Sequence, residues 1–147
     1  IPITLSVSLH SPFDDIRTEM MPIGKKYKIR DVIEACKYYE NKSKRRISFE
    51  YTLIEGINDR REDVEGLVKL LAGLNSHINL IPLNPIKEYE EARPSINNIE
   101  RFQKQLTRNN IQVTIRREKG IDISASCGQL RRDYLSNQSY YSKCEVR

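Results

Sequence analysis

The sequence has 147 residues, a formal net charge of +5 and a pI of about 9.1. Hydrophobic residues make up 38% of the chain and charged residues 31%, which suffices for one domain with a core. No apolar run approaches the roughly 20 residues that a membrane-spanning helix needs, and no signal peptide is apparent. The basic charge permits binding to nucleic acid but does not require it.

The chain is predicted to alternate strands and helices. Residue 1 is isoleucine, and a buried strand already begins near Ile3, so we expect a fragment whose N-terminal part is missing. A short helix follows, capped by Ser11 with Asp14 in a capping box, and it ends near residue 21. The β-branched and apolar runs predict strands at residues 3–9, 47–54, 77–83 and 111–115.

Three longer helices are expected between these strands. Apolar spacing predicts one from Ile29 to about Asn41, with Cys36 on its buried face. A second should start at a cap formed by Asp59 and Glu62 and end at Gly73. A third should be capped by Ser95 and run to about Arg108. This alternation predicts an α/β fold with a parallel sheet, either a small open sheet or part of a larger barrel.

Glu50 and His77 are titratable side chains in the predicted strands. Glu50 lies in an apolar run and faces either a polar interior or solvent, while His77, at a strand entrance, is expected to be structural. In parallel sheets, ligands bind beyond the carboxyl ends of the strands. The polar residues expected there are Ser8, His10, Asn84 and Cys127.

Cys127 stands out among the three cysteines at positions 36, 127 and 144. Small residues flank it, and basic residues precede and follow it in the sequence: Arg116, Arg117, Lys119, Arg131 and Arg132. Nearby cations favour the thiolate, which is the nucleophile, so Cys127 is either a reactive cysteine or a buried structural one. The odd cysteine count, without zinc-ligand spacing, predicts a reducing, cytoplasmic location.

Six short motifs occur in a fixed order along residues 1 to about 132. They are Ser8–Pro12, Met21–Ile23, Phe49–Tyr51, Gly56–Asp59, Asn79–Pro85 and Cys127–Leu130. In this order and spacing, the sequence resembles the C-terminal half of the RlmN/Cfr family of radical S-adenosylmethionine (SAM) enzymes, which methylate adenine in RNA. The segment around Asn79 and the Arg93-Pro94-Ser95 helix start look more like the adenine-C2-methylating RlmN branch.

The resemblance implies a fold and a set of roles. Residues 1–134 would be the C-terminal part of a partial (β/α)6 TIM-like barrel, and residues 135–147 a flexible tail. Ser8, Leu9, His10 and Asn84 would bind SAM. Cys127 would be methylated by one SAM, lose hydrogen to a radical formed from a second SAM on a 4Fe-4S cluster, and add to adenine C2. A second cysteine would resolve the adduct, so a disulfide bond is expected in the whole enzyme.

The resemblance also implies partners and gaps. The substrates would be 23S rRNA and tRNA, the electrons would come from a donor protein, and the full-length enzyme would be a cytoplasmic monomer without a membrane anchor. The cluster-binding Cys-x3-Cys-x2-Cys motif, the Gly-Glu motif and the resolving cysteine are absent here, so this chain supplies no metal ligand. Cys36 and Cys144 match none of these positions, and Ser124 stands where the family usually has an acid.

We therefore expect the isolated chain to lack turnover, to bind no cluster and to bind SAM only weakly. Two other functions are compatible with the residues. One is a catalytically inactive RNA-binding remnant, suggested by the basic clusters at residues 25–28, 42–46 and 116–119. The other is a cysteine hydrolase that pairs Cys127 with His10 or His77.

Overall fold

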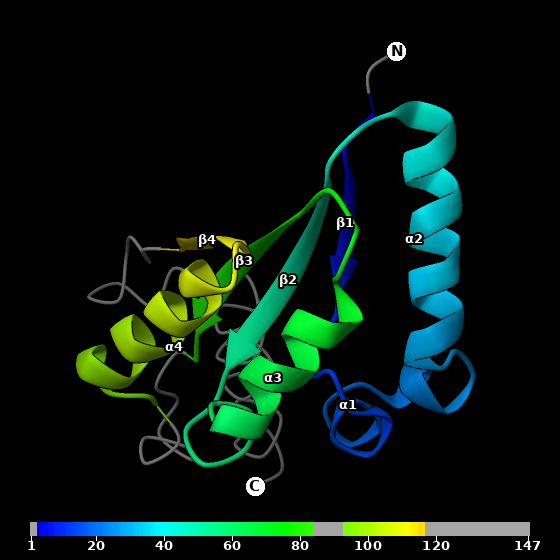
Figure 1. Cartoon of the computed structure of the whole chain (residues 1–147). Coiled ribbons are helices and arrows are strands. Elements are labelled where there is room, and N and C mark those ends of the chain that lie inside the picture. The colour runs from blue at the N-terminus through cyan, green and yellow to red at the C-terminus, as the bar shows by residue number, and fades with distance from the viewer. Residues whose placement is uncertain (1–2, 84–92, 117–147) are drawn as a thin grey trace, which may run out of the picture. The chain divides into compact units, whose positions relative to one another are not determined.

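The computed structural model describes residues 3–83 and 93–116. These residues form four strands, four α-helices and one short 3-10 helix (Figure 1). In chain order they are β1 (Leu5–Ser8), α1 (Asp14–Met20), the 3-10 helix η1 (Pro22–Lys25), α2 (Ile29–Ser43), β2 (Ile47–Leu53), α3 (Arg61–Leu70), β3 (Ser76–Pro82), α4 (Ile96–Arg108) and β4 (Gln112–Ile115). The predicted alternation of strands and helices is confirmed.

The four strands form one parallel sheet in the order β1-β2-β3-β4. Each neighbouring pair is joined through a helix, so the fold is α/β and built of βα units. All four strands have their carboxyl ends at the same edge of the sheet. Because β1 and β4 each pair on one side only, the described part of the chain is an open sheet rather than a closed barrel.

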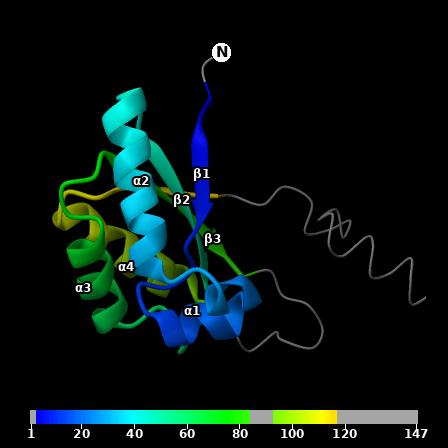
Figure 2. The same ribbon diagram turned by 90° about the vertical axis from the view of Figure 1, so that its right-hand side faces the viewer.

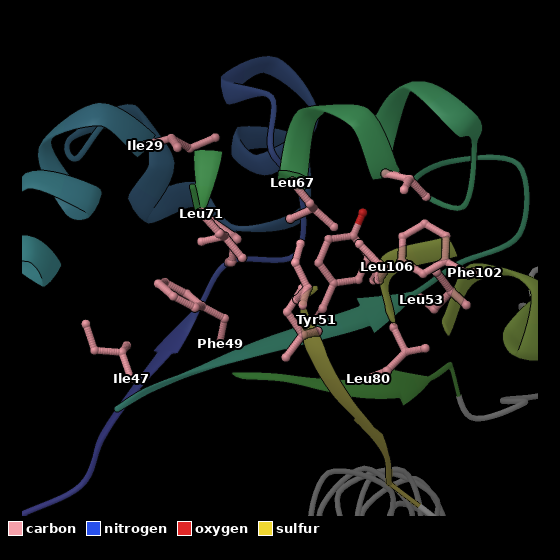
Figure 3. Close-up of a cluster of buried hydrophobic side chains, with 14 of the residues drawn as sticks. Ile29, Ile47, Phe49, Tyr51, Leu53, Leu67, Leu71, Leu80, Phe102 and Leu106 are labelled. Atoms are coloured by element: carbon pink, nitrogen blue, oxygen red, sulfur yellow. The ribbon is translucent and has the colours of Figure 1, made fainter. Parts of the chain in front are cut away.

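The core lies between one face of the sheet and the helices α2, α3 and α4, which lie together on that face (Figure 2). Alternate residues of β2, from Ile47 to Leu53, are fully buried there, as a strand period of two requires. Tyr51 stacks on Phe102 of α4, with ring centroids 5.5 Å apart (Figure 3). Cys36 is 2% exposed on the inner face of α2, so its predicted place in the core is confirmed.

Three helix starts were predicted with caps, and only one cap is as expected. Ser95 accepts a hydrogen bond from the Asn98 N–H at 3.2 Å and caps α4 as predicted. The prediction that Ser11 caps the first helix is wrong: Phe13 is the N-cap, and the Ser11 hydroxyl accepts the Phe13 N–H in a local turn.

The two carboxylates predicted to act in these caps, Asp14 and Asp59, accept other backbone N–H groups. Asp14 accepts the N–H of Ile29 at 2.9 Å and so satisfies the start of α2, a helix 15 residues further on. At α3, Arg60 is the N-cap and Asp63 accepts its N–H at 3.0 Å, so the expected box of Asp59 and Glu62 is wrong by one residue. Asp59 instead accepts the Gly56 N–H within the preceding turn.

In the described ranges, no helix is long and apolar enough to cross a membrane. The predicted boundary near residue 134, and the tail that would follow it, lie outside those ranges.

Candidate functional site

The segment Ser8-Leu9-His10 lies where β1 ends, at the carboxyl edge of the sheet. The N–H groups of Leu9 and His10 both donate to the carbonyl of Glu50, at 3.0 and 3.4 Å. The Leu9 side chain is fully buried in the core, so only its main chain is available to a ligand. Ser8 is exposed and, by strand alternation, lies on the face of the sheet opposite the helices.

His10 is held in an uncommon conformation by β2. Its φ of 59° lies in the left-handed region, and its Nδ1 accepts the Thr52 N–H at 3.0 Å. Burial, and next the positive charge of Arg17, lower the pKa of His10 below its usual value of 6.5, with Glu50 acting in the opposite direction. The ring is therefore neutral near pH 7 with its proton on Nε2, which leaves one ring donor at this edge.

Arg17 is a buried cation directly behind this segment. It is 3% exposed, and its guanidinium donates to the carbonyls of Tyr27 at 3.1 Å and Ser8 at 3.4 Å. No sequence pattern indicated this role, because Arg17 lies in a short helix of mixed polarity, where a basic residue normally points to solvent. Arg17 ties α1 and the residues before α2 to the end of β1.

The face of the sheet without helices is polar across all four strands. Register pairs Ser8 with Glu50, Glu50 with Asn79, and Asn79 with Thr114, so these four side chains form one row. The Glu50 carboxylate accepts from Ser6 Oγ at 3.1 Å and from Asn79 Nδ2 at 3.0 Å. Glu50 is thus half-buried at an alternate position of β2, on a polar face that no described helix covers, so both interpretations of this residue stay open.

His77 lies on the same face but toward the opposite edge of the sheet. It is the second residue of β3, whereas His10 follows the end of β1. Its Nε2 lies 2.9 Å from Thr114 Oγ1. Burial, and next Arg46, lower its pKa. The two histidines therefore cannot serve one nucleophile together, and the hydroxyl contact agrees with the structural role expected for His77.

The other predicted site residues, Asn84 and Cys127, lie outside the described ranges, as does Cys144. The structure therefore brings together Ser8, Leu9 and His10 but does not test the other two positions. Cys36, the one cysteine within the described ranges, is free, and burial raises its pKa, so it is neither a nucleophile nor half of the expected disulfide.

Two cofactors are expected, SAM and a 4Fe-4S cluster, and the described residues fit SAM. An exposed serine, a neutral histidine with a ring N–H and a polar sheet face offer the hydrogen-bonding groups that the hydroxyl and carboxylate groups of SAM need. A cluster requires several cysteine ligands, and among the described residues no group of three or more cysteine, histidine or acidic side chains is placed to hold a metal. These residues do not fit an iron–sulfur cluster.

One part of the site was overlooked at the level of sequence: the side chain of Asn58. It is fully buried and donates to the His10 carbonyl at 2.8 Å. The Gly56–Asp59 motif drew attention only as a turn. A signal was available, since asparagine side chains in turns often hydrogen-bond to nearby backbone, but nothing in the sequence indicated a partner 48 residues away.

Comparison with known proteins gives a consistent family. The chain is 50% identical over 137 residues to a probable dual-specificity RNA methyltransferase RlmN of Alkaliphilus oremlandii, covering 93% of this chain and 40% of that protein. It is 53% identical over 134 residues to the protein of the same description from Clostridium botulinum, covering 91% of this chain and 39% of the relative. No protein-family model matches the chain.

Solved structures agree with this result. A radical SAM methyltransferase from Sphaerobacter thermophilus superposes with a TM-score of 0.82 at 44% identity, covering 88% of this chain and 38% of that one. A domain of pyruvate-formate lyase-activating enzyme from Bacteroides vulgatus reaches a TM-score of 0.60 at 19% identity and so shares the fold alone. The expected radical SAM fold is thus confirmed for the part of it that this chain contains.

The chain spans about 40% of the length of the curated relatives it matches. At about 50% identity over nearly its whole length, it is a homologue of the RNA methyltransferases named RlmN, and it corresponds to about two-fifths of such a protein.

Proposed function

We propose that this chain is the C-terminal part of a radical SAM RNA methyltransferase that acts on adenine C2 of 23S rRNA and tRNA. The observation that carries the proposal is 50% identity to RlmN proteins over 93% of the chain. The placement of Ser8 and His10 at the carboxyl edge of a parallel sheet supports it, because α/β enzymes bind ligands there.

In this proposal, SAM lies against the carboxyl edge of the sheet and supplies the methyl group and, with a cluster held elsewhere, the radical chemistry. Ser8 and His10 hydrogen-bond to it through Oγ and Nε2, Leu9 contributes its main chain, and Asn84 holds its amino-acid end. Cys127 carries the methyl group. Adenine C2 is electron-poor and therefore a poor acceptor for direct methyl transfer from SAM. A covalent thioether carrier divides this difficult transfer into two easier steps.

RNA is the macromolecular partner in this proposal. The exposed basic residues Lys25, Lys26 and Lys28 precede α2 and therefore lie at the same edge of the sheet as His10. Cations at this edge suit the phosphates on either side of a base taken out of its stack. The residues at 42–46 lie in the last turn of α2 and directly after it, at the other end of the strands, where contact with the same RNA segment is not expected. A reducing cytoplasmic compartment and an electron-donor protein complete the proposal.

The test is a chimera in which this chain replaces the matching 134 residues of the Clostridium botulinum relative. The chimera is expressed in bacteria that do not themselves methylate adenine C2 in RNA. It should methylate adenine C2 in 23S rRNA and tRNA, and mass spectrometry of digested RNA measures the product. Cys127→Ala should abolish the methylation, whereas the matched variant Cys36→Ala, in the core, should retain it. Methylation that survives Cys127→Ala would contradict the assigned role.

The inactive RNA-binding remnant would give a different pattern. It would bind RNA in the chimera and yield no methylation, whether position 127 is cysteine or alanine. A cysteine hydrolase would need His10 as its base, but the Nδ1 of His10 is already bonded to Thr52, and its ring proton is on Nε2.

A further inference from the structure

The turn that follows β2 reaches back to the segment of the proposed SAM site. Asn58 Nδ2 donates to the His10 carbonyl at 2.8 Å and to the Thr52 carbonyl at 2.6 Å. Its Oδ1 accepts the Ile54 N–H at 2.8 Å. One fully buried side chain therefore joins the end of β2 to His10, two residues after the end of β1.

These bonds take the place of the backbone hydrogen bonds between β1 and β2, which stop where β1 ends at Ser8. In a regular parallel pair, the Thr52 N–H would donate to a carbonyl of the neighbouring strand. Here that N–H donates to the His10 ring, and the carbonyls of His10 and Thr52 are both taken by Asn58. A left-handed backbone costs a non-glycine residue such as His10 roughly 1–2 kcal/mol. Such a conformation persists where several surrounding contacts hold it in place.

The turn that carries Asn58 is itself fixed. The Tyr51 hydroxyl donates to the Asn58 carbonyl at 2.7 Å, in the core. Asp59 accepts the Gly56 N–H at 2.9 Å, and Gly56 has a φ of 73°, which favours glycine. Asn58 is thus held from both sides, which a side chain needs if it is to set the position of another residue.

We propose that Asn58 is the positioning residue of this site: its side-chain amide fixes His10 in the left-handed conformation in which Nδ1 takes the Thr52 N–H and Nε2 keeps the proton for a ligand. The inference rests on the proposed function for the identity of that ligand, SAM. It assigns to the Gly56–Asp59 motif a role that neither the fold nor the catalytic chemistry had explained.

The first test needs no ligand. Nitrogen NMR of histidine-labelled chain should show His10 neutral at pH 7 with its proton on Nε2, the signals being assigned with a His77→Gln variant. Asn58→Ala and the near-isosteric Asn58→Asp should shift His10 toward a mixture of tautomers. The control Asn109→Ala, which also removes an amide bonded to a carbonyl, should not. An unchanged His10 tautomer in a folded Asn58 variant would overturn the proposal.

The second test separates this inference from the proposed function. Titration of SAM into the wild-type chain, followed by NMR shifts of residues 8–10, should show weak binding, and Asn58→Ala should weaken it at least about tenfold. Equal binding by wild type and a folded Asn58→Ala variant would overturn the positioning role and leave the proposed function intact. Should neither protein respond to SAM while the tautomer still depends on Asn58, the positioning role stands and the proposed function fails. If both Asn58 variants unfold, a wild-type His10 proton on Nδ1 contradicts the proposal.

Discussion

At the scale of single residues, the hydroxyl of Tyr51 is the contact that joins the core to the site. It donates to the buried carbonyl of Asn58 at 2.7 Å, and burial raises the pKa of Tyr51 well above 10. Tyr51→Phe leaves that carbonyl without its partner, which should lower the free energy of unfolding by about 1–2 kcal/mol. Urea denaturation measures the change. Tyr38→Phe, on an exposed ring, should alter stability little, and equal effects of the two variants would contradict the prediction.

The two histidines predict a pH dependence of stability. Both folded-state pKa values lie below 6.5, chiefly through burial, and the charged groups Arg17 and Glu50 also act on His10. Because the unfolded chain binds protons first, this contribution to stability is fully present above about pH 6.5 and is lost as pH falls through the folded-state pKa.

The measurement is the urea midpoint of wild type and His10→Asn between pH 7.5 and pH 5. Asparagine tolerates the left-handed backbone but does not titrate, so the variant should lose less stability on acidification than wild type does. Carboxylates titrate in both proteins and cancel in the difference. Parallel curves would show that His10 is not the group responsible.

At the scale of elements, helix α3 packs closely against the loop between β1 and α1 at Gly66. A Cβ placed on Gly66 would lie 2.8 Å from Pro12 Cγ and 3.2 Å from Phe13 Cζ. Gly→Ala inside a helix normally stabilises by roughly 1 kcal/mol, but here the rigid proline ring must move, and overpacking costs about 1–3 kcal/mol. Gly66→Ala should therefore destabilise the fold by about 1–2 kcal/mol in urea denaturation, while Glu65→Ala, exposed beside it, changes little. A stabilised Gly66→Ala variant would show that α3 is not in tight contact with Pro12.

The elements also show how far sequence reasoning extends. The strands around Phe49 and Ile78 were predictable because period-two burial and β-branched runs are local properties. The cap at Ser95 was predictable for the same reason. The roles of Asp14, Arg17 and Asn58 were not, because each side chain serves a backbone group 9 to 48 residues away. The contact of Asn58 with His10 forms only once the sheet has brought β1 beside β2. In the candidate site, position at a strand end was therefore predictable, but the support behind it was not.

At the scale of the whole molecule, the sheet has a polar face where a ligand would lie, and among residues 3–83 and 93–116 its outer strands β1 and β4 each pair on one side only. Ser6, Glu50 and Asn79 are joined by hydrogen bonds on the face without helices, so these side chains are held in place without a ligand. Two unpaired strand edges are a hazard for association. The proposed function implies a division of labour in the enzyme: under it, this chain would supply SAM contacts and the methyl carrier, and the ligands of the cluster would come from elsewhere.

That division gives the prediction for the isolated chain. Cys36, the one cysteine in the described ranges, is buried with a raised pKa. The three cysteines of the sequence, at positions 36, 127 and 144, also lack the Cys-x3-Cys-x2-Cys spacing expected of the cluster ligands. Anaerobic reconstitution with iron and sulfide, followed by removal of unbound iron, should give no visible absorption of a 4Fe-4S protein and no methylation of RNA, while a bacterial ferredoxin treated in parallel takes up its cluster. The same chain should still show SAM-dependent NMR shifts at residues 8–10. A stoichiometric cluster on this chain would contradict the division of labour, because the cysteines at 36, 127 and 144 would then be ligands and Cys127 would not be free to carry a methyl group.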